Sequence, residues 1–508
     1  MSVLSFEGNI AVPARWCKPM TMKGLEALAT AMRPRVLAKY LGVFCLSLVV
    51  IAAVPGFVAL MMGEFGFAAA CGIVAVVLGA AGLPLARLPA PRDIQRNEAM
   101  AVTALGFALG ALAMTWPFAA AGMPPLDALF ESVSAITTTG LSAAGSTEGK
   151  SGAFIFARAW AQWYGGLAII ILAFVLVLGP GATARRLTLS ETGPEDLVGG
   201  TWTHGRRVLI IYAGLTVAGG ILLWAFGASP FDAAVHALAS LSTGGFSSHD
   251  DSVAAVGGPA VRSLVVLLCL AGAISFTLQY QTWRSGLVTL LRDGAVRTLF
   301  AVILLVWGMV MLSEWLAGAA ADVALMGDAA FMAVSAQTTS GFQTIDPAGL
   351  APATKLALIF SMAVGGDVGS TAGGLKILRL LVMLRLVQLL FAQTVTPRHA
   401  VIEPRIAGRS LGQGEIAAAG GIVTLYAGTI LLSWFCFLVA GLEPLDSLFD
   451  VVSAIGTVGL SAGIAGPELA TPLKLVLCLD MLMGRLEILA ILVLAYPRNW
   501  FAPRRGDS

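Results

Sequence analysis

Residues 127–142 read DALFESVSAITTTGLS, and similar stretches follow at 231–247 (FDAAVHALASLSTGGFS), 328–344 (DAAFMAVSAQTTSGFQT) and 446–461 (DSLFDVVSAIGTVGLS). Each copy carries an aspartate thirteen residues before its last shared glycine and ends in a turn of Thr, Ser and Gly. The copies recur every 96 to 118 residues. A single turn of this kind is uninformative, but four in register form an internal repeat, which organises the rest of the chain.

The composition places the chain in a lipid bilayer. Of its 508 residues, 57% are hydrophobic and 12% are charged, and the mean hydropathy is +0.86. This is too apolar for a soluble protein, so we expect an all-α polytopic membrane protein. Ten apolar segments are long enough to span a bilayer: 40–62, 65–86, 99–123, 159–178, 208–227, 263–283, 298–321, 355–392, 416–442 and 472–497.

One copy of the repeat lies between the two spans of each of the last four pairs. Its apolar part has about ten residues, which at about 1.5 Å per residue crosses only about half of the hydrocarbon core. Each copy therefore predicts a re-entrant half-helix followed by a turn. The expected fold has four units of span, half-helix, filter turn and span around one pore, preceded by two extra spans.

The expected boundaries follow from this count of segments. The chain divides into a cytoplasmic N-terminus (1–36), a two-span N-terminal unit (37–90), four pore units (97–180, 206–285, 296–392 and 413–498) and a cytoplasmic tail (499–508). The linkers 180–205 and 394–414 are polar, punctuated by Gly and Pro, and too short to form a soluble domain.

The distribution of charge predicts the orientation. Arginines cluster in the segments on one side of the membrane, whereas the other side carries little more than Lys150, Arg262, Lys355 and Lys474. By the positive-inside rule, both termini are expected in the cytoplasm. All four turns then enter the membrane from the outside.

The four turns have the chemistry of a cation site. Non-helical backbone at membrane depth must be enclosed by protein or line water. The shared glycine permits a left-handed backbone, and Thr or Ser adds a neutral hydroxyl, so four turns around one axis would give the ring of oxygens that replaces the hydration shell of potassium. The negative C-terminal ends of the half-helices also favour a cation. The predicted filter comprises Thr138, Thr139, Gly140, Thr243, Gly244, Gly245, Thr339, Ser340, Gly341, Thr457, Val458 and Gly459.

A plainer alternative is that these are only helix-breaking turns in a transporter built from repeats, with no ion at the glycines. The aspartate that leads each copy also has two interpretations. We interpret it as the N-cap of its half-helix in preference to an ion site.

A second interruption lies in the third unit, where residues 361–380 read SMAVGGDVGSTAGGLKILRL. Five glycines in a short stretch disfavour a continuous helix, so this span is expected to open into a flexible loop beneath the third turn. The alternative is a glycine-rich helix packed closely against its neighbours. The predicted gate comprises Gly365, Gly366, Asp367, Gly369, Ser370, Thr371, Gly373 and Gly374, together with Arg485 in the last span.

The last span contains the ionisable residues Asp480, Arg485 and Glu487. Such groups inside a membrane usually face a cavity or a partner. The guanidinium of Arg485 would repel a cation in the pore, or tether the glycine-rich loop through a carboxylate such as Asp367. The alternative is a structural ion pair with Asp480 or Glu487 away from the pore.

Together these residues resemble the superfamily of potassium transporters that includes the bacterial Trk and Ktr membrane subunits and the plant HKT proteins. The resemblance runs from about residue 40 to residue 497. Its most specific parts are the four turns and the segments QWYGGLAIIILA (162–173), GGDVGSTAGGLKILR (365–379) and GRLEI (484–488). Because two spans precede the first unit, the chain looks like a Trk-type potassium uptake subunit.

The resemblance implies potassium uptake across the inner, or plasma, membrane of a bacterium through a gated, channel-like pore. It implies bound potassium as the substrate and no cofactor in this chain. The family carries one filter glycine per unit, and members with serine at the first of them tend to carry sodium, so Gly140 favours potassium. Asp367 and Ala372 depart from the family pattern, which has a small uncharged residue and a glycine there. An acidic group at the gate is expected to alter its stability or to pair with Arg485.

The resemblance also implies partners. It implies a homodimer and a cytoplasmic ring of nucleotide-binding regulatory subunits. The chain has neither a G-x-G-x-x-G fingerprint after a strand nor a Walker A pattern, so nucleotide would bind to that separate subunit. Membrane lipid is a further expected partner, and nucleic acid is not.

Two other classes of function were weighed. An intramembrane aspartyl protease would need G-x-G-D, but Val364 breaks that pattern, and the four histidines have no metal-binding spacing, so we expect no enzyme. A potassium carrier coupled to protons or sodium, or a sodium-permeable member, is a nearer alternative. Proton coupling would require buried carboxylates, for which the candidates are Glu131, Asp367, Asp480 and Glu487.

Overall fold

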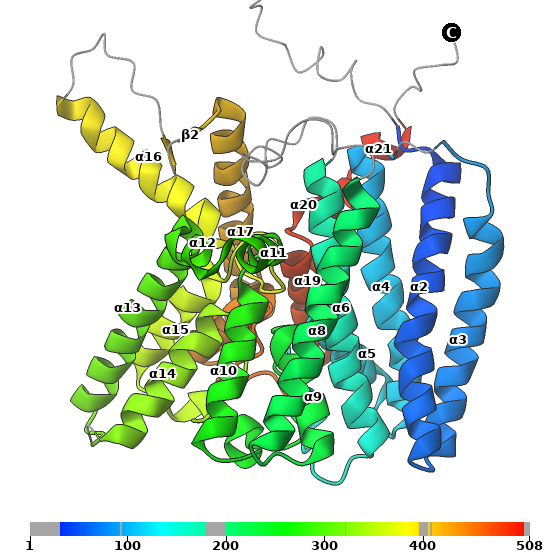
Figure 1. Ribbon diagram of the computed structural model, residues 1–508, viewed down its shortest axis with the longest axis horizontal. Helices are drawn as coiled ribbons and strands as arrows, with labels where there is room; N and C mark the ends of the chain where they lie inside the picture. Colours follow the sequence, from blue (N-terminus) through cyan, green and yellow to red (C-terminus); the bar gives the residue numbers. More distant parts are fainter. Residues whose placement is uncertain are drawn as a thin grey trace, which may run out of the picture.

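A computed structural model describes residues 31–91, 94–178, 200–320, 322–395, 405–406 and 409–501. Most of the expected cytoplasmic N-terminus, most of both linkers and most of the expected tail lie outside these residues. The described chain is largely helical, and its long helices run side by side (Figure 1). One two-residue antiparallel ladder joins β1 (Arg405–Ile406) to β2 (Arg409–Ser410). The all-α class is confirmed.

The N-terminal pair of helices, α2 (Pro34–Met61) and α3 (Phe65–Ala86), packs together at one end of the molecule (Figure 1). α2 also contacts α4 (Arg96–Ala120) and α6 (Gly152–Leu178). The Arg33 guanidinium just before α2 forms an ion pair of 2.8 Å with the buried carboxylate of Glu98 in α4. The extra pair is thereby fixed to the first repeat unit.

Each repeat unit contains a long helix, a half-helix and a returning helix. The first unit has α4, α5 (Pro125–Ile136) and α6, and the second has α8 (Gly200–Ala225), α9 (Pro230–Leu241), α10 (Pro259–Ala273) and α11 (Phe276–Ser285), followed by α12 (Leu287–Arg292). The third has α13 (Gly294–Leu316), α14 (Val323–Gln337), α15 (Pro352–Val364) and α16 (Ile377–Val395). The fourth has α17 (Gln413–Val439), α18 (Pro444–Ile455), α19 (Thr471–Arg485) and α20 (Leu489–Ala495), followed by α21 (Arg498–Phe501). Short 3₁₀ turns, η2 (Ser252–Ala255) and η3 (Pro347–Gly349), lie after two of the half-helices.

In the described part of the chain, eight helices are long and apolar enough to cross a membrane, or nine if the bent pair α10 and α11 counts as one span. The expected span 355–392 is divided between α15 and α16, as its glycines predicted. The expected span 472–497 is divided between α19 and α20. One expectation is wrong: the segment 263–283 is not continuous, because α10 and α11 meet at an angle of 102°. The chain is a multi-pass membrane protein.

The half-helices α5, α9 and α18 have 12 residues each, and α14 has 15. The interpretation of the leading aspartates as N-caps is wrong. The N-cap residues are Pro124, Ser229, Asp322 and Glu443, because three of the half-helices begin with a proline at their first position. Asp127, Asp232 and Asp446 lie inside the first turn, where a carboxylate still favours the helix dipole.

Two of these aspartates join neighbouring units. Lys474 of α19 forms an ion pair of 2.5 Å with Asp127 of α5, and Lys355 of α15 forms one of 2.6 Å with Asp446 of α18. Each lysine also donates to a carbonyl oxygen seven residues earlier in its own unit. The fourth unit is thereby connected to the first, and the third to the fourth.

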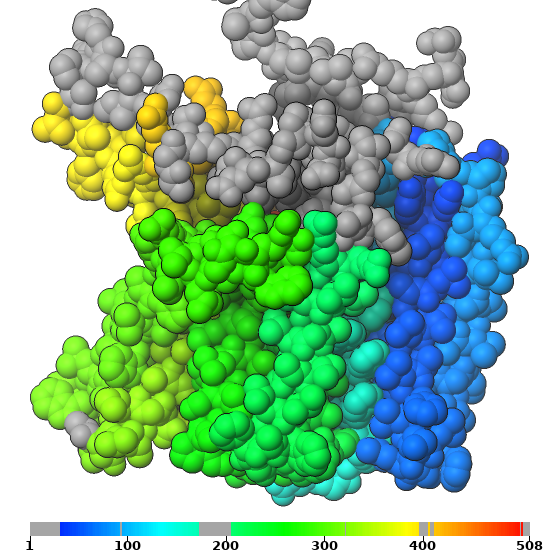
Figure 2. Space-filling view, in the orientation of Figure 1, coloured from blue at the N-terminus to red at the C-terminus, as the bar shows by residue number. Residues whose placement is uncertain are grey.

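Burial separates the inner and outer faces of the helix bundle. The outward faces of the long helices carry exposed large apolar side chains, including Phe57, Val217, Leu304 and Leu431. Figure 2 shows these helices covering one side of the molecule, from α2 and α3 at one end to α13 and α14 at the other. The half-helices lie inside, and most of their residues are buried. Lipid therefore faces apolar side chains, while the non-helical turns are enclosed by protein.

Candidate functional site

All four half-helices end in the same backbone motif. The residue two before each shared glycine is a threonine with positive φ, at 56° for Thr138, 51° for Thr243, 53° for Thr339 and 49° for Thr457. The next residue donates its N–H to a carbonyl five residues earlier, at 2.8 to 3.0 Å. This is a Schellman cap, in which glycine is the usual left-handed residue.

Threonine is an unfavourable choice at that position. A β-branched residue with positive φ is an outlier, and such strain, which costs about 1–3 kcal/mol, gathers at functional sites. The same strain at four equivalent positions indicates that the threonine side chain is needed where it lies. The hydroxyls of Thr138 and Thr457 are buried and have no hydrogen-bond partner among the described residues.

The four shared glycines lie in a closed ring. Each has a positive φ, at 94° for Gly140, 79° for Gly245, 72° for Gly341 and 97° for Gly459. A Cβ added to any one of them would clash with a backbone carbonyl oxygen of the next turn: Gly140 with Gly244, Gly245 with Ser340, Gly341 with Val458, and Gly459 with Thr139. The chain thus brings all twelve residues of the predicted filter together around one axis.

The returning helices pass close to the ends of the half-helices. In the first, second and fourth units, a Cβ on a glycine of the returning helix would clash with the last helical carbonyl of the half-helix, pairing Gly165 with Ile136, Gly272 with Leu241, and Gly484 with Ile455. This close packing holds the C-terminal ends of these three half-helices toward the ring. The partial negative charge of these ends favours a cation there.

A polar side chain nine residues before the shared glycine supports the stretch after the turn in three units. Glu131 accepts from the hydroxyl of Ser142 at 3.0 Å, and Asp450 accepts from that of Ser461 at 2.7 Å. His236 lies 3.0 Å from the hydroxyl of Ser247. The third unit has Met332 at this position. Sequence reasoning considered Glu131 only for proton coupling and missed His236 and Asp450, although their spacing from the glycines was a usable signal.

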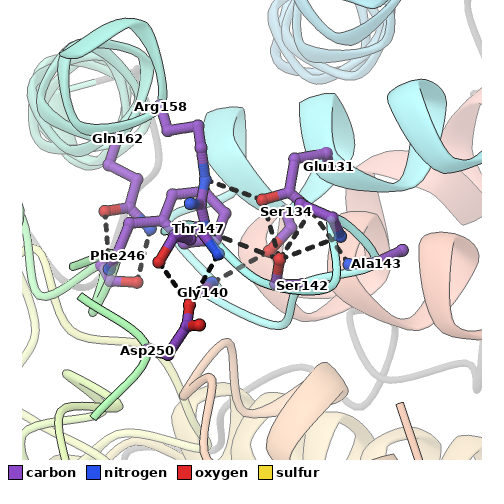
Figure 3. A network of polar contacts seen from close by, with 12 residues as sticks. Glu131, Ser134, Gly140, Ser142, Ala143, Thr147, Arg158, Gln162, Phe246 and Asp250 are labelled. Atoms are coloured by element: carbon purple, nitrogen blue, oxygen red, sulfur yellow. Dashed lines mark hydrogen bonds and ion pairs between the residues drawn. The ribbon is translucent and has the colours of Figure 1, made fainter. Parts of the chain in front are cut away.

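The first of these supports lies in a larger network, which Figure 3 shows. Arg158 of α6 forms a 2.7 Å ion pair with Glu131, and both side chains are buried. The guanidinium carbon also lies 3.9 Å from the centre of the Phe246 ring in the second unit. Outside the spans, Asp250 accepts hydrogen bonds from Ser146 and Thr147. The first and second units are therefore joined twice after their turns, by the contact of Arg158 with Phe246 and by the hydrogen bonds to Asp250.

The pKa of Asp250 follows from its partners. Burial alone would raise this pKa, but hydrogen bonds from the side chains of Ser146 and Thr147 and from nearby backbone N–H groups outweigh burial and hold it below its usual value. The ionised form of the Asp250 carboxylate is thus favoured in the loop that follows the second turn.

The glycine-rich loop lies directly against the third and fourth turns. The N–H of Gly373 donates to the hydroxyl of Thr339 at 2.7 Å, and a Cβ on Gly373 would clash with the Thr457 hydroxyl. The predicted gate residues from Gly365 to Gly374 and the filter residues are therefore neighbours.

The same loop is bonded to the break in the second unit. The N–H of Thr371 donates to the carbonyl of Gly272 and that of Asp367 to the carbonyl of Ala273, both at 3.0 Å. The N–H of Phe276 donates to the carbonyl of Gly369 at 3.2 Å. These bonds pair the carbonyls that the sharp bend frees from the helix of α10, and they explain why the bend lies there.

Arg485 contacts the loop through backbone and not through a carboxylate. Its guanidinium donates to the carbonyls of Thr371 at 2.7 Å and Gly165 at 3.2 Å. The other two ionisable residues of the last span have different partners: Glu487 forms an ion pair of 2.5 Å with Arg379, and Asp480 accepts from Ser433 at 2.7 Å. The alternative of a structural ion pair between Arg485 and Asp480 or Glu487 is wrong.

Known proteins resemble the chain over most of its length. A family model described as a cation transport protein, TrkH, matches residues 97–501. The Trk system potassium uptake protein TrkI of Halomonas elongata is 32% identical over 91% of this chain and 96% of its own length. The Trk system potassium uptake protein TrkH of Vibrio parahaemolyticus is 29% identical over 80% of this chain and 87% of its own length.

A solved structure of a related transporter has the same fold as this chain. The crystal structure of the potassium transporter TrkH from Vibrio parahaemolyticus superposes with a TM-score of 0.82 at 26% identity, covering 92% of this chain and all of that one. The matching family is one of transporters, so the expectation that the chain is not an enzyme is confirmed. The chain belongs to the TrkH family of cation transport proteins.

Proposed function

We propose that this chain takes up potassium through a gated, channel-like pore whose filter is the ring of four turns. The observation that carries the proposal is the closed ring itself. Four strained threonines and four left-handed glycines lie at equivalent positions, and each glycine contacts a carbonyl of the next turn. Neutral backbone and hydroxyl oxygens in a ring replace the hydration shell of an alkali cation without adding charge. Potassium uptake is also what several relatives are named for.

The gate in this proposal is the loop from Gly365 to Gly374. It lies against the hydroxyls of two filter threonines, and Arg485 donates to its backbone. A fixed positive charge beside the pathway opposes a cation. Opening would require the loop to leave Thr339 and the guanidinium to leave Thr371.

Ion pairing favours this pore over a proton-coupled carrier. Two of the carboxylates that proton coupling could use are engaged, Glu131 with Arg158 and Glu487 with Arg379. Asp480 is 1% exposed and forms no ion pair with a described residue. Asp367 likewise forms no ion pair with a described residue, so Asp367 and Asp480 are the carboxylates on which a coupled carrier would have to rely.

The proposal also includes a membrane location, an orientation and partners. The arginine-rich segments on one side support termini in the cytoplasm, and the family resemblance supports a location in the inner (plasma) membrane of a bacterium. A homodimer, a nucleotide-binding regulatory subunit and surrounding lipid are proposed as partners on the family resemblance. The long helices that carry exposed apolar side chains offer the surface for lipid or a second copy.

The test is ion flux in liposomes that contain the purified full-length chain, under potassium, sodium and proton gradients imposed in turn. Potassium should flow down its own gradient without a proton or sodium gradient, and sodium should flow much more slowly. Potassium movement that requires a proton gradient, and that Asp480→Asn abolishes, would establish the carrier instead.

A further inference from the structure

The four turns of the ring are not built alike, and the second has its own support. Six residues before the shared glycine, the first and fourth turns have serines whose hydroxyls accept from the glycine N–H at 3.0 Å, Ser134 for Gly140 and Ser453 for Gly459. The third turn has Ser335, which donates to the carbonyl of Phe342. The second has Ala239, which offers no hydroxyl.

Gln162 of α6 supplies the missing support from the neighbouring unit. Its amide nitrogen donates to the carbonyl of Gly244 at 2.5 Å, and its amide oxygen accepts from the N–H of Phe246 at 3.2 Å. One fully buried side chain thus holds the backbone on both sides of the filter glycine Gly245. Figure 3 shows Gln162 beside Phe246. A primary amide can do this because it carries a donor and an acceptor together.

No other returning helix with an equivalent position offers an amide there. The returning helices align on the glycines that touch the ends of the half-helices, Gly165, Gly272 and Gly484. Three residues before them lie Gln162, Cys269 and Met481. Among these three units, the amide clamp is therefore specific to the helix that contacts the second turn.

Gly244 and Gln162 are sterically coupled. The residue just before the shared glycine is Thr139, Ser340 or Val458 in the other turns, but Gly244 in the second. Gly244 does not have a positive φ, so its backbone does not require glycine. A Cβ there would clash with the side-chain amide of Gln162. The space that a side chain fills in the other turns is filled here by the glutamine.

The first and third turns show what a side chain does in that space. The hydroxyl of Thr139 lies 2.8 Å from that of Thr137, and that of Ser340 lies 3.0 Å from that of Thr338. Each pair bridges the end of the half-helix to the filter. The second unit retains Ser242 at the matching position, but Gly244 has no hydroxyl to meet it.

We propose that Gln162 is a positioning residue for the second filter turn, replacing both the serine and the hydroxyl bridge used elsewhere, and that it sets the selectivity of the ring between potassium and sodium. This inference rests on the proposed function. The carbonyl of Gly244 lies against Gly140 of the neighbouring turn. A shift of that carbonyl therefore changes the arrangement of oxygens around a potassium-sized ion.

The experiment measures the ratio of potassium to sodium flux for the full-length chain in liposomes. Gln162→Ala should lower that ratio about fivefold, the effect of losing about 1 kcal/mol of hydrogen bonding at the filter. Gln162→Leu, which nearly keeps the side-chain volume, should lower it similarly if Gln162→Ala does not fold. The matched control is Thr216→Val, which removes the 2.9 Å bond from Trp163, the next residue along α6, away from the ring; the control should keep the ratio.

The decisive variant is Gln162→Ala combined with Gly244→Ser. It gives the second turn the hydroxyl bridge of the first and third, so the ratio should recover toward that of the parent chain. Gly244→Ser alone should lower the ratio, because the new side chain meets Gln162. An unchanged ratio in both Gln162 variants, or a double variant no better than Gln162→Ala, overturns the inference.

A binding measurement separates this inference from the proposed function. The thermal midpoint of the purified protein in potassium chloride, minus that in sodium chloride, reports cation preference without transport. Gln162→Ala should reduce this difference, while Thr216→Val should leave it. A parent chain that moves no potassium would contradict the proposed function. Equal cation dependence in the parent and in Gln162→Ala would contradict the inference alone.

Discussion

The guanidinium of Arg485 donates a 2.7 Å hydrogen bond to the carbonyl oxygen of Thr371. This bond joins the last span of the fourth unit to the loop of the third, beneath the ring of filter turns. Arg485 is 3% exposed, and it also reaches the carbonyl of Gly165 in the first unit. One side chain therefore links three of the four units at the level of the proposed gate.

Arg485→Ala should raise potassium flux, because it removes both the tether on the loop and the positive charge beside the pathway. Arg485→Gln retains one donor for Thr371 without the charge, so it separates the two effects. If the tether dominates, Arg485→Gln should resemble the parent chain, and if the charge dominates it should resemble Arg485→Ala. Flux in liposomes at matched protein density is the measurement. A lower flux for Arg485→Ala at normal expression would contradict the gate.

Gly140→Ser should lower the ratio of potassium to sodium uptake. Gly140 has a φ of 94°, and a Cβ there would clash with the carbonyl of Gly244, so a serine must displace the second turn. Uptake in a potassium-uptake-deficient strain, with sodium as the competing ion, measures the ratio. Gly149→Ser is the matched control, because Gly149 has a φ of 93° but open space where a Cβ would be added. Unchanged selectivity for Gly140→Ser would count against a filter at this position.

Deleting residues 369–374 should leave the pore leaky, because these residues carry the bonds from the loop to Thr339, Gly272 and Arg485. Thr371→Val is a milder variant. It removes the hydroxyl that lies 3.0 Å from the carbonyl of Leu241 and 2.8 Å from that of Gly272. It should raise resting potassium flux by less than the deletion does. A fully blocked pore in the deletion variant would contradict the gate assignment.

The repeat made the general plan of the fold predictable. Four copies with one shared spacing indicated four half-helices and four equivalent turns, and five glycines in one stretch indicated the break between α15 and α16. The bend between α10 and α11 was not predictable, because its residues Ile274 and Ser275 carry no breaking signal. It depends on the loop of another unit, whose N–H groups pair the freed carbonyls of Gly272 and Ala273.

The site was predictable to a lesser extent than the fold. The turns of the proposed filter could be recognised from their residue types. The partners of Arg485 could not, because they are backbone carbonyls, which every residue type carries. The prediction that the leading aspartates are N-caps failed for a different reason. Prolines at the first helical positions of α5, α9 and α18 were available as start signals and place those aspartates one turn inside.

Glu131→Gln should destabilise the protein by about 3–5 kcal/mol, because it leaves the buried charge of Arg158 without its ion-pair partner. The control is Glu131→Gln combined with Arg158→Met. Replacing both members of the pair leaves no unpaired buried charge, so the double variant should unfold at a higher temperature than the single one. The thermal midpoint in detergent is the measurement, and equal midpoints would show that the pair is not coupled.

Protonation of Asp250 should lower the stability of the folded protein at acidic pH. Its pKa in the folded chain lies below the usual value, which is about 3.9 in an unfolded chain. Ionised Asp250 therefore contributes stability that is fully present above about pH 4 and is lost as the pH falls through the lower, folded pKa.

Asp250→Asn should lower the thermal midpoint at pH 7, and this difference should shrink below pH 4 as the parent loses the same contribution. Glu148→Gln, an exposed change in the neighbouring loop, is the control. A difference between Asp250→Asn and the parent that stays constant from pH 7 to pH 3 would show that the carboxylate is not held ionised by Ser146 and Thr147.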